Sequence, residues 1–143
     1  MFEKEIADCA GKFLVTTISS NISRLSQAID VSLRQGRKVV LVGRSIENNM
    51  KLAEKLKYLH YPPGTFIKKK EMNDYSAKEL TLLVAGSQGQ SGSSLDRIVA
   101  GEYEGVSIEV EDKVIFSTDV IPGNEKAIYQ LIDNVYRQGA TVV

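Results

Sequence analysis

The chain has 143 residues, of which 43% are hydrophobic and 25% charged, and its formal net charge is zero. This composition and length predict one ordinary globular domain. No stretch has the about 18 consecutive apolar residues of a membrane span, and the charged start lacks the apolar core of a signal peptide. We therefore expect a cytoplasmic protein with no membrane partner.

The single cysteine and the single histidine limit the available chemistry. Cys9 has no second cysteine for an internal disulfide, and Cys9 and His60 alone do not form a zinc site of the usual kinds. A serine triad or cysteine dyad would need His60, which lies in a proline-containing turn sequence at 58–63. The sequence thus predicts no catalytic residue, and no metal or cofactor held by this chain.

The predicted elements alternate between helices and strands along the chain. The predicted strands are at 13–17, 38–42, 80–85 and 113–117, with a fifth opening at 141. A helix at 2–10 precedes the first strand, and a short helix begins at 93 or 94. The other three helices have apolar positions from 22 to 33, from 46 to 56 behind Ser45, and from 128 to 135 between Asn124 and Gly139. Asn21 or Ser20 is expected to cap the second helix, and Gly36 to end it.

Two less regular regions allow further short strands, at 65–67 and at 106–110. The apolar runs of the main strands are continuous rather than alternating, which is typical of strands buried on both faces. With right-handed crossovers, the fold class is α/β: a three-layer sandwich with a doubly wound, mostly parallel sheet, Rossmann-like in outline.

Charge is unevenly distributed along the sequence. Residues 1–71 hold 13 Lys and Arg against 7 Asp and Glu, and residues 72–143 hold 5 against 11. Such a split can steer a polyanion toward one face. An interleaved fold would instead mix the two halves in space, and the lysine run at 68–70 is more typical of a solvated turn than of a phosphate clamp.

Four predicted strands end in turns rich in hydroxyl groups, amides and glycine. In open α/β sheets ligands bind at this carboxyl edge, where small side chains and helix N-termini suit anions. The turn at 86–94 has many glycines but is neither a Walker loop nor a dinucleotide fingerprint. Arg44 and, one helical turn into its helix, Arg24 are cations able to pair with a phosphate, although both also fit surface positions. Asp119 is the one acid in these turns, which disfavours two-carboxylate chemistry.

These turns resemble those of a known family. The segments 17–24, 36–45, 86–89 and 121–125 occur in the order and at about the spacing of the β-CASP domain of ribonuclease J-like proteins, of the metallo-β-lactamase superfamily. The resemblance covers nearly the whole chain. The chain departs from the family's usual residues at 90–92, where Glu-Pro is common, at Ser23, where histidine is common, and at Asp119, where serine is common.

The resemblance implies that residues 1–143 are a single β-CASP domain excised from a larger parent with a metallo-β-lactamase-type domain. The parent would be a zinc-dependent ribonuclease for RNA processing or decay, and the isolated chain would be inactive because the metal ligands lie outside it. Expected partners are RNA, the companion domain of the same parent and a second copy in a homo-oligomer. The residues expected to bind RNA or its phosphates are Ser19, Ser20, Asn21, Arg24, Arg44, Ser87, Gln88 and Gly89.

Two other functions fit the same sequence. A free-standing α/β module could bind a mononucleotide or another small phosphate at the same edge of the sheet. An interaction domain could use the sheet edge for dimerisation. The sequence alone leaves both alternatives open.

Overall fold

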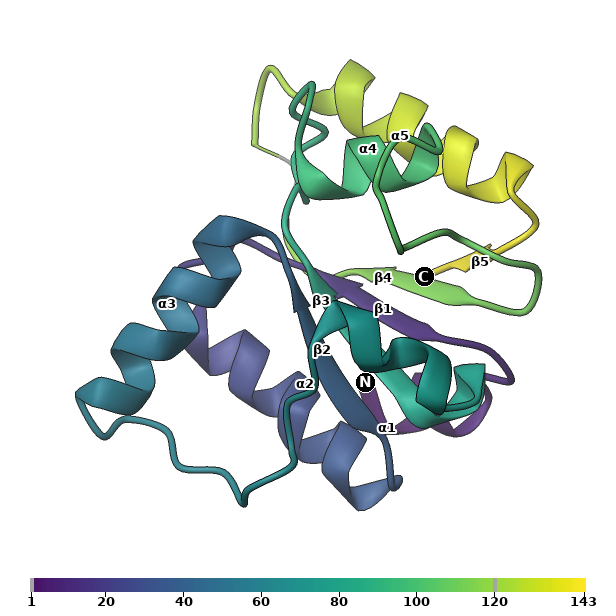
Figure 1. Cartoon of the computed structure of the whole chain (residues 1–143). Coiled ribbons are helices and arrows are strands. Elements are labelled where there is room, and N and C mark those ends of the chain that lie inside the picture. The colour runs from purple at the N-terminus through teal and green to yellow at the C-terminus, as the bar shows by residue number, and fades with distance from the viewer. Residues whose placement is uncertain (1, 120) are drawn as a thin grey trace.

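The computed structural model describes residues 2–119 and 121–143. Its centre is a five-stranded sheet with the order β2-β3-β1-β4-β5, in which every paired strand is parallel (Figure 1). The strands are β1 (Phe13–Thr16), β2 (Lys38–Val42), β3 (Leu80–Val84), β4 (Lys113–Phe116) and β5 (Thr141–Val142). All five predicted strands are confirmed, with ends that differ by one residue or less.

Helices cover both faces of the sheet and give the predicted three layers. One face is covered by α1 (Phe2–Ala7), α2 (Ile22–Arg34) and α3 (Arg44–Lys55), which share an apolar cluster with alternate residues of the strands. The other face is covered by α4 (Ser94–Val99), α5 (Glu125–Arg137) and the 3-10 helix η1 (Lys69–Asp74), with a second 3-10 turn, η2 (Ala77–Glu79), just before β3. No described helix is long and apolar enough to cross a membrane.

The strands alternate the side chains that they give to the two clusters. In β1, Phe13 and Val15 pack under α1 and α2, whereas Leu14 packs with the α4 and α5 layer. All three are completely buried, which explains why the apolar runs in the sequence are continuous.

The two irregular regions differ from their predictions. The edge strand expected at 65–67 is reduced to one parallel bridge between Val39 and Phe66. The strand expected at 106–110 is wrong: Val106 and Ile108 alternate inward with a strand-like period, but the backbone N–H of Glu109 donates to the side chain of Asp112 rather than to a neighbouring strand. The first helix ends at Ala7, three residues earlier than predicted.

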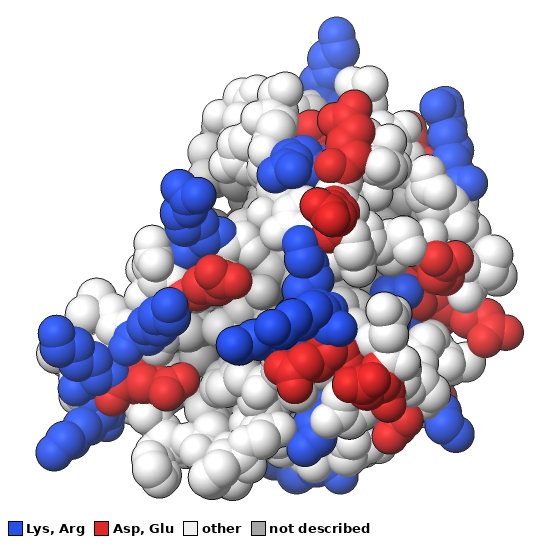
Figure 2. Space-filling view, in the orientation of Figure 1, with Lys and Arg blue, Asp and Glu red and all other residues white. Residues whose placement is uncertain are grey.

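The strand order mixes the two halves of the chain. β1 and β2 come from the basic half and alternate with strands of the acidic half across the sheet. On the face shown in Figure 2, basic and acidic side chains lie interspersed. The steering of a polyanion by two separate half-molecules of opposite charge is therefore not favoured.

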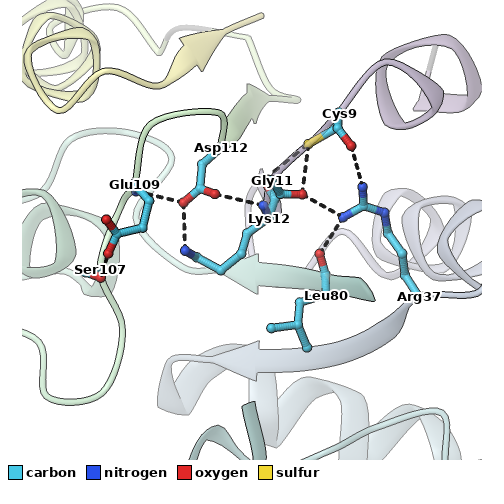
Figure 3. Close-up of polar contacts among 8 residues, drawn as sticks. All are labelled: Cys9, Gly11, Lys12, Arg37, Leu80, Ser107, Glu109 and Asp112. Carbon is cyan, nitrogen blue, oxygen red and sulfur yellow. Dashed lines mark hydrogen bonds and ion pairs between the residues drawn. The ribbon is translucent and has the colours of Figure 1, made fainter. Parts of the chain in front are cut away.

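A buried polar network closes the amino ends of the strands (Figure 3). The Arg37 guanidinium donates to three backbone carbonyl oxygens, those of Cys9 at 2.9 Å, Gly11 at 3.1 Å and Leu80 at 2.7 Å. Beside it, the Lys12 ammonium lies 2.8 Å from the Asp112 carboxylate, and both side chains are buried. This edge is occupied by internal contacts, so the opposite, carboxyl edge is the one left for a ligand.

Thr16 provides a test of polar burial in this sheet. Its hydroxyl, completely buried at the end of β1, has no hydrogen-bond partner among the described residues. Thr16→Val replaces an unsatisfied hydroxyl by a methyl group of similar size and should raise the free energy of unfolding by up to about 1 kcal/mol. The matched control is Thr81→Val, because the buried Thr81 hydroxyl is hydrogen-bonded to Ser32 at 2.8 Å and its loss should destabilise the fold. Urea unfolding measures the free energy of unfolding of both variants. The prediction would be contradicted if Thr16→Val lowered this free energy as much as Thr81→Val does.

Candidate functional site

The carboxyl ends of the strands open into two adjoining hollows. The first has a volume of about 480 Å³ and is lined mainly by the turns after β1, β2 and β3. The second, of about 660 Å³, is lined mainly by the turns after β1 and β4. Ile18 and Ile121 line both hollows and so form the ridge between them.

Close packing of the turns after β2 and β3 depends on two glycines. Gly43 has φ +121° and Gly86 has φ +113°, conformations that other residues rarely adopt. A Cβ at Gly43 would lie 2.9 Å from the Ser94 hydroxyl oxygen, and one at Gly86 would lie 2.5 Å from that of Ser93. The glycines thus let these turns pack tightly against the start of α4.

Six of the eight residues predicted to bind RNA or phosphate line the two hollows. Ser19, Arg44, Ser87 and Gln88 line the first, and Asn21 and Arg24 line the second. The other two are placed elsewhere. Ser20 lines a separate small hollow beside α3, and Gly89 packs on α5, where a Cβ would lie 2.7 Å from the carbonyl carbon of Ala127.

The side chain of Gln88 is engaged inside the protein. It is only 3% exposed, and its amide nitrogen donates to the backbone oxygen of Asp119 at 3.0 Å. Its amide oxygen accepts from the backbone N–H of Ile121 at 3.1 Å and from the side chain of Asn124 at 3.3 Å. Gln88 therefore ties the turn after β3 to the turn after β4.

Two further side chains that the sequence did not single out fix the turn after β1. The Thr17 hydroxyl donates to the backbone oxygen of Ser117 at 2.8 Å, and the Asn49 amide of α3 donates to the backbone oxygen of Ser19 at 2.8 Å. No sequence signal marks Asn49, because it lies in the middle of a helix. Asn21 caps α2 as predicted: its side-chain oxygen accepts from the backbone N–H of Arg24 at 3.1 Å.

The charges at this edge are sparse and unequally placed. Exposed Arg44, the first residue of α3, is the one charged side chain among the described residues that line the first hollow. Among the described residues that line the second hollow are one cation, Arg24, and one acid, Asp119. The first hollow is therefore the better anion site, since its cation is not opposed by a carboxylate and lies at a helix N-terminus.

The residues present do not fit a catalytic metal. Within residues 2–119 and 121–143, no three His, Cys, Asp or Glu side chains gather into a metal-binding group. The Cys9 thiol is buried at the amino edge, where it donates to backbone oxygens, and His60 is exposed on the loop after α3. A ligand at the carboxyl edge would meet hydroxyls, amides, two arginines and the carboxylate of Asp119.

An all-parallel sheet between two layers of helices, with hollows at its carboxyl edge, defines a doubly wound α/β domain. The family model for the β-CASP domain of ribonuclease J matches residues 10–135, and the chain belongs to that family.

Several proteins of established name are similar to the chain. It is 35% identical to Ribonuclease J of Helicobacter pylori strain 26695 over 99% of its length, 36% identical to Ribonuclease J 1 of Streptococcus pyogenes over 98%, and 33% identical to Ribonuclease J of Corynebacterium glutamicum over 96%. The matched segment makes up 20%, 25% and 19% of those proteins, respectively, so the chain spans about a fifth to a quarter of their length.

Proposed function

We propose that this chain is the part of a metal-dependent ribonuclease that holds the RNA strand, and that hydrolysis takes place in a companion domain of the metallo-β-lactamase type outside residues 1–143. The observation that carries the proposal is the pair of adjoining hollows at the carboxyl edge, with Arg44 and Arg24 at their rims. Membership of the β-CASP family and the names of the longer relatives support it.

The chemistry of the edge suits the backbone of RNA rather than its bases. Arg44 can pair with a phosphate at the N-terminus of α3, a helix of 12 residues. The hydroxyl groups of Ser19, Ser45 and Ser94 line the same hollow and can donate to phosphate or sugar oxygens. Such contacts hold a strand without selecting its sequence.

No hydrolytic step is assigned to the residues of this chain. The zinc of the proposed parent has no donor set among the described side chains, so its ligands belong to the companion domain. We further propose that the parent works in the cytoplasm and forms a homo-oligomer, which cell fractionation and sizing of the parent test.

The proposal predicts the effect of Arg44→Ala on RNA binding. Titration of the chain with a fluorescent, 5′-phosphorylated RNA at several salt concentrations should give weak, salt-dependent binding. Loss of one phosphate contact should lower the slope of log affinity against log salt by about 0.7. Arg34→Ala is the matched control, because Arg34 is exposed and pairs with Glu3 at 2.6 Å, away from both hollows.

Two results would contradict the proposal. One is an identical salt slope for Arg44→Ala, Arg34→Ala and the unchanged chain. The other is RNA cleavage by the chain itself when zinc or manganese is added to the same titration, since it would require a catalytic centre in these residues.

A second function is favoured by the size of the first hollow. Its volume of about 480 Å³ lies in the range of small-ligand sites, about 300 to 1,000 Å³. A free-standing module for a mononucleotide or a small phosphate would therefore fit there as well. Calorimetric titration with a mononucleotide distinguishes the two: binding much tighter than that of an RNA oligomer would favour the small-ligand module.

A further inference from the structure

A further hollow lies next to the carboxyl-edge site, along the outer side of β2. It has a volume of about 440 Å³ and lies between α3, the residues before η1 and Tyr103. We call it the β2 groove and define it by six of its lining residues, Glu47, Lys51, Phe66, Lys68, Lys69 and Tyr103. Three of these are cations and one is an acid, and the two others are aromatic.

Two cations near the groove are held in place by one aromatic ring. The Lys69 ammonium and the Arg97 guanidinium each lie 4.9 Å from the centre of the Tyr103 ring. The stem of Lys69 also lies against Gly105, where a Cβ would be 3.4 Å from the Lys69 Cε. Lys69 is exposed, as expected for the predicted solvated turn, and its side chain lies against the Tyr103 ring and Gly105.

Glu47 is the one acid among the described residues that line the groove, and it offsets one of the three lysine charges, which leaves an excess of cations; the other acidic side chains nearby do not line it. The side chain of Glu71 is engaged with the backbone N–H of Lys68, at 2.9 Å. Glu102 and Glu104 flank Tyr103 in sequence, but neither lines the groove. Figure 2 shows basic side chains near the centre of this face, with acidic side chains directly beside them.

The β2 groove adjoins the carboxyl-edge site through α3. Val42, the last residue of β2, lines the groove, and Arg44, two residues later, lines the first hollow. Arg44, Glu47 and Lys51 follow one another at helical spacing on the same side of α3. A strand that leaves the first hollow past Arg44 would thus reach the β2 groove along this side of α3, past Glu47 and Lys51.

We propose that the β2 groove binds the sugar–phosphate backbone of the same RNA strand, beyond the part held at the carboxyl edge. This inference rests on the proposed function. Single-stranded nucleic acids bind in grooves that combine cations along the backbone with aromatic side chains, and the β2 groove combines three lysines with Phe66 and Tyr103.

The test uses two RNA lengths and one triple variant. Short RNA of about 5 nucleotides is sized for the carboxyl edge alone, and RNA of about 16 nucleotides is sized to continue into the groove. The variant combines Lys51→Gln, Lys68→Gln and Lys69→Gln. Its matched control, with the same loss of charge at exposed sites outside the groove, combines Lys4→Gln, Lys55→Gln and Lys78→Gln.

The groove variant should bind the long RNA about tenfold more weakly at low salt, with a salt slope lower by about 2, because three phosphate contacts are lost. Its affinity for the short RNA should be within twofold of that of the unchanged chain. The control variant should bind both RNAs within twofold of the unchanged chain. Arg44→Ala, in contrast, should weaken the binding of both lengths.

The outcomes separate this inference from the proposed function. If the groove variant binds long RNA normally while Arg44→Ala is impaired, the inference is overturned and the proposed function stands. If the control variant loses as much affinity as the groove variant, the effect is one of net charge and the inference is overturned. The inference is also overturned if the groove variant binds an acidic peptide less tightly than the unchanged chain does but binds long RNA equally well. If no variant alters RNA binding, the proposed function fails as well.

Tyr103 gives an independent check that does not change the charge. Tyr103→Leu keeps an apolar side chain but removes the ring that holds Lys69 and Arg97, and it should weaken long-RNA binding alone. Tyr103→Phe keeps the ring and should bind long RNA as tightly as the unchanged chain does. Equal affinities of the two variants for long RNA would contradict the inference.

Discussion

Arg37→Met is expected to lower the free energy of unfolding by about 3 kcal/mol, the largest effect on stability that we predict for a single substitution. Methionine keeps the apolar stem but removes the donors for three buried carbonyl oxygens, those of Cys9, Gly11 and Leu80. Arg37 is 4% exposed, so water does not replace the lost contacts. Burial lowers the pKa of the guanidinium, and Cys9 and, to a lesser extent, Asp112 oppose that shift.

Urea unfolding measures this effect, with Arg34→Ala as the control. Arg34 comes from the same segment and has an ion pair with Glu3, but its side chain is 60% exposed. Exposed pairs contribute little, so the control should change the free energy of unfolding by less than about 1 kcal/mol. Similar losses for the two variants would show that the three carbonyl contacts of Arg37 are unimportant.

Under the proposed function, Gln88→Leu is expected to reduce RNA affinity about tenfold, a loss of about 1.4 kcal/mol in binding free energy. Leucine fills a similar buried volume but cannot bridge the backbone of Asp119 to that of Ile121. Freed from this bridge, the turn after β4 should lose its fixed position at the ridge between the two hollows. Hydrogen exchange of residues 117–124 without RNA should rise, and exchange in β3 should not.

Gln88→Glu tests the same bridge with a nearly identical shape. One carboxylate oxygen can still accept from the N–H of Ile121, but the other would face the backbone oxygen of Asp119, which needs a donor. The free energy of unfolding should therefore fall at neutral pH and recover toward that of the unchanged chain as the pH is lowered and the carboxyl group binds a proton. If exchange of residues 117–124 is normal in both variants while RNA binding is lost, Gln88 contacts RNA directly.

The sheet could be predicted from sequence because its physical cause is local. Strands buried on both faces need continuous apolar residues, and Phe13, Leu14 and Val15 are all fully buried in the centre of the sheet. The same reasoning failed at 106–110, where Val106 and Ile108 point inward from a loop. A period of two reports which side chains are buried, but it does not report whether a neighbouring strand accepts the backbone hydrogen bonds.

The candidate site was predictable only to the level of its turns. Parallel strands bring their carboxyl ends to one edge, so the turns that contain Ser19, Arg44 and Ser87 could be grouped from the strand positions alone. The internal use of the Gln88 side chain and the placement of Ser20 in another hollow depend on contacts between distant segments. The β2 groove escaped prediction for the same reason, since it joins α3 to Tyr103 across about two-fifths of the chain.

The strand order also determines when this protein can fold during synthesis. The central strand β1 pairs with β3 and β4. Phe13 can therefore pair only after Thr81 on one side and Lys113 on the other have been synthesised. Until residues near 117 have left the ribosome, β1 carries an apolar sequence with at least one open edge. Such long-range pairing slows folding and exposes nascent chains to aggregation. Both neighbours of β1 are thus available only after β4 has been made, and β5 (Thr141–Val142) completes the sheet later still.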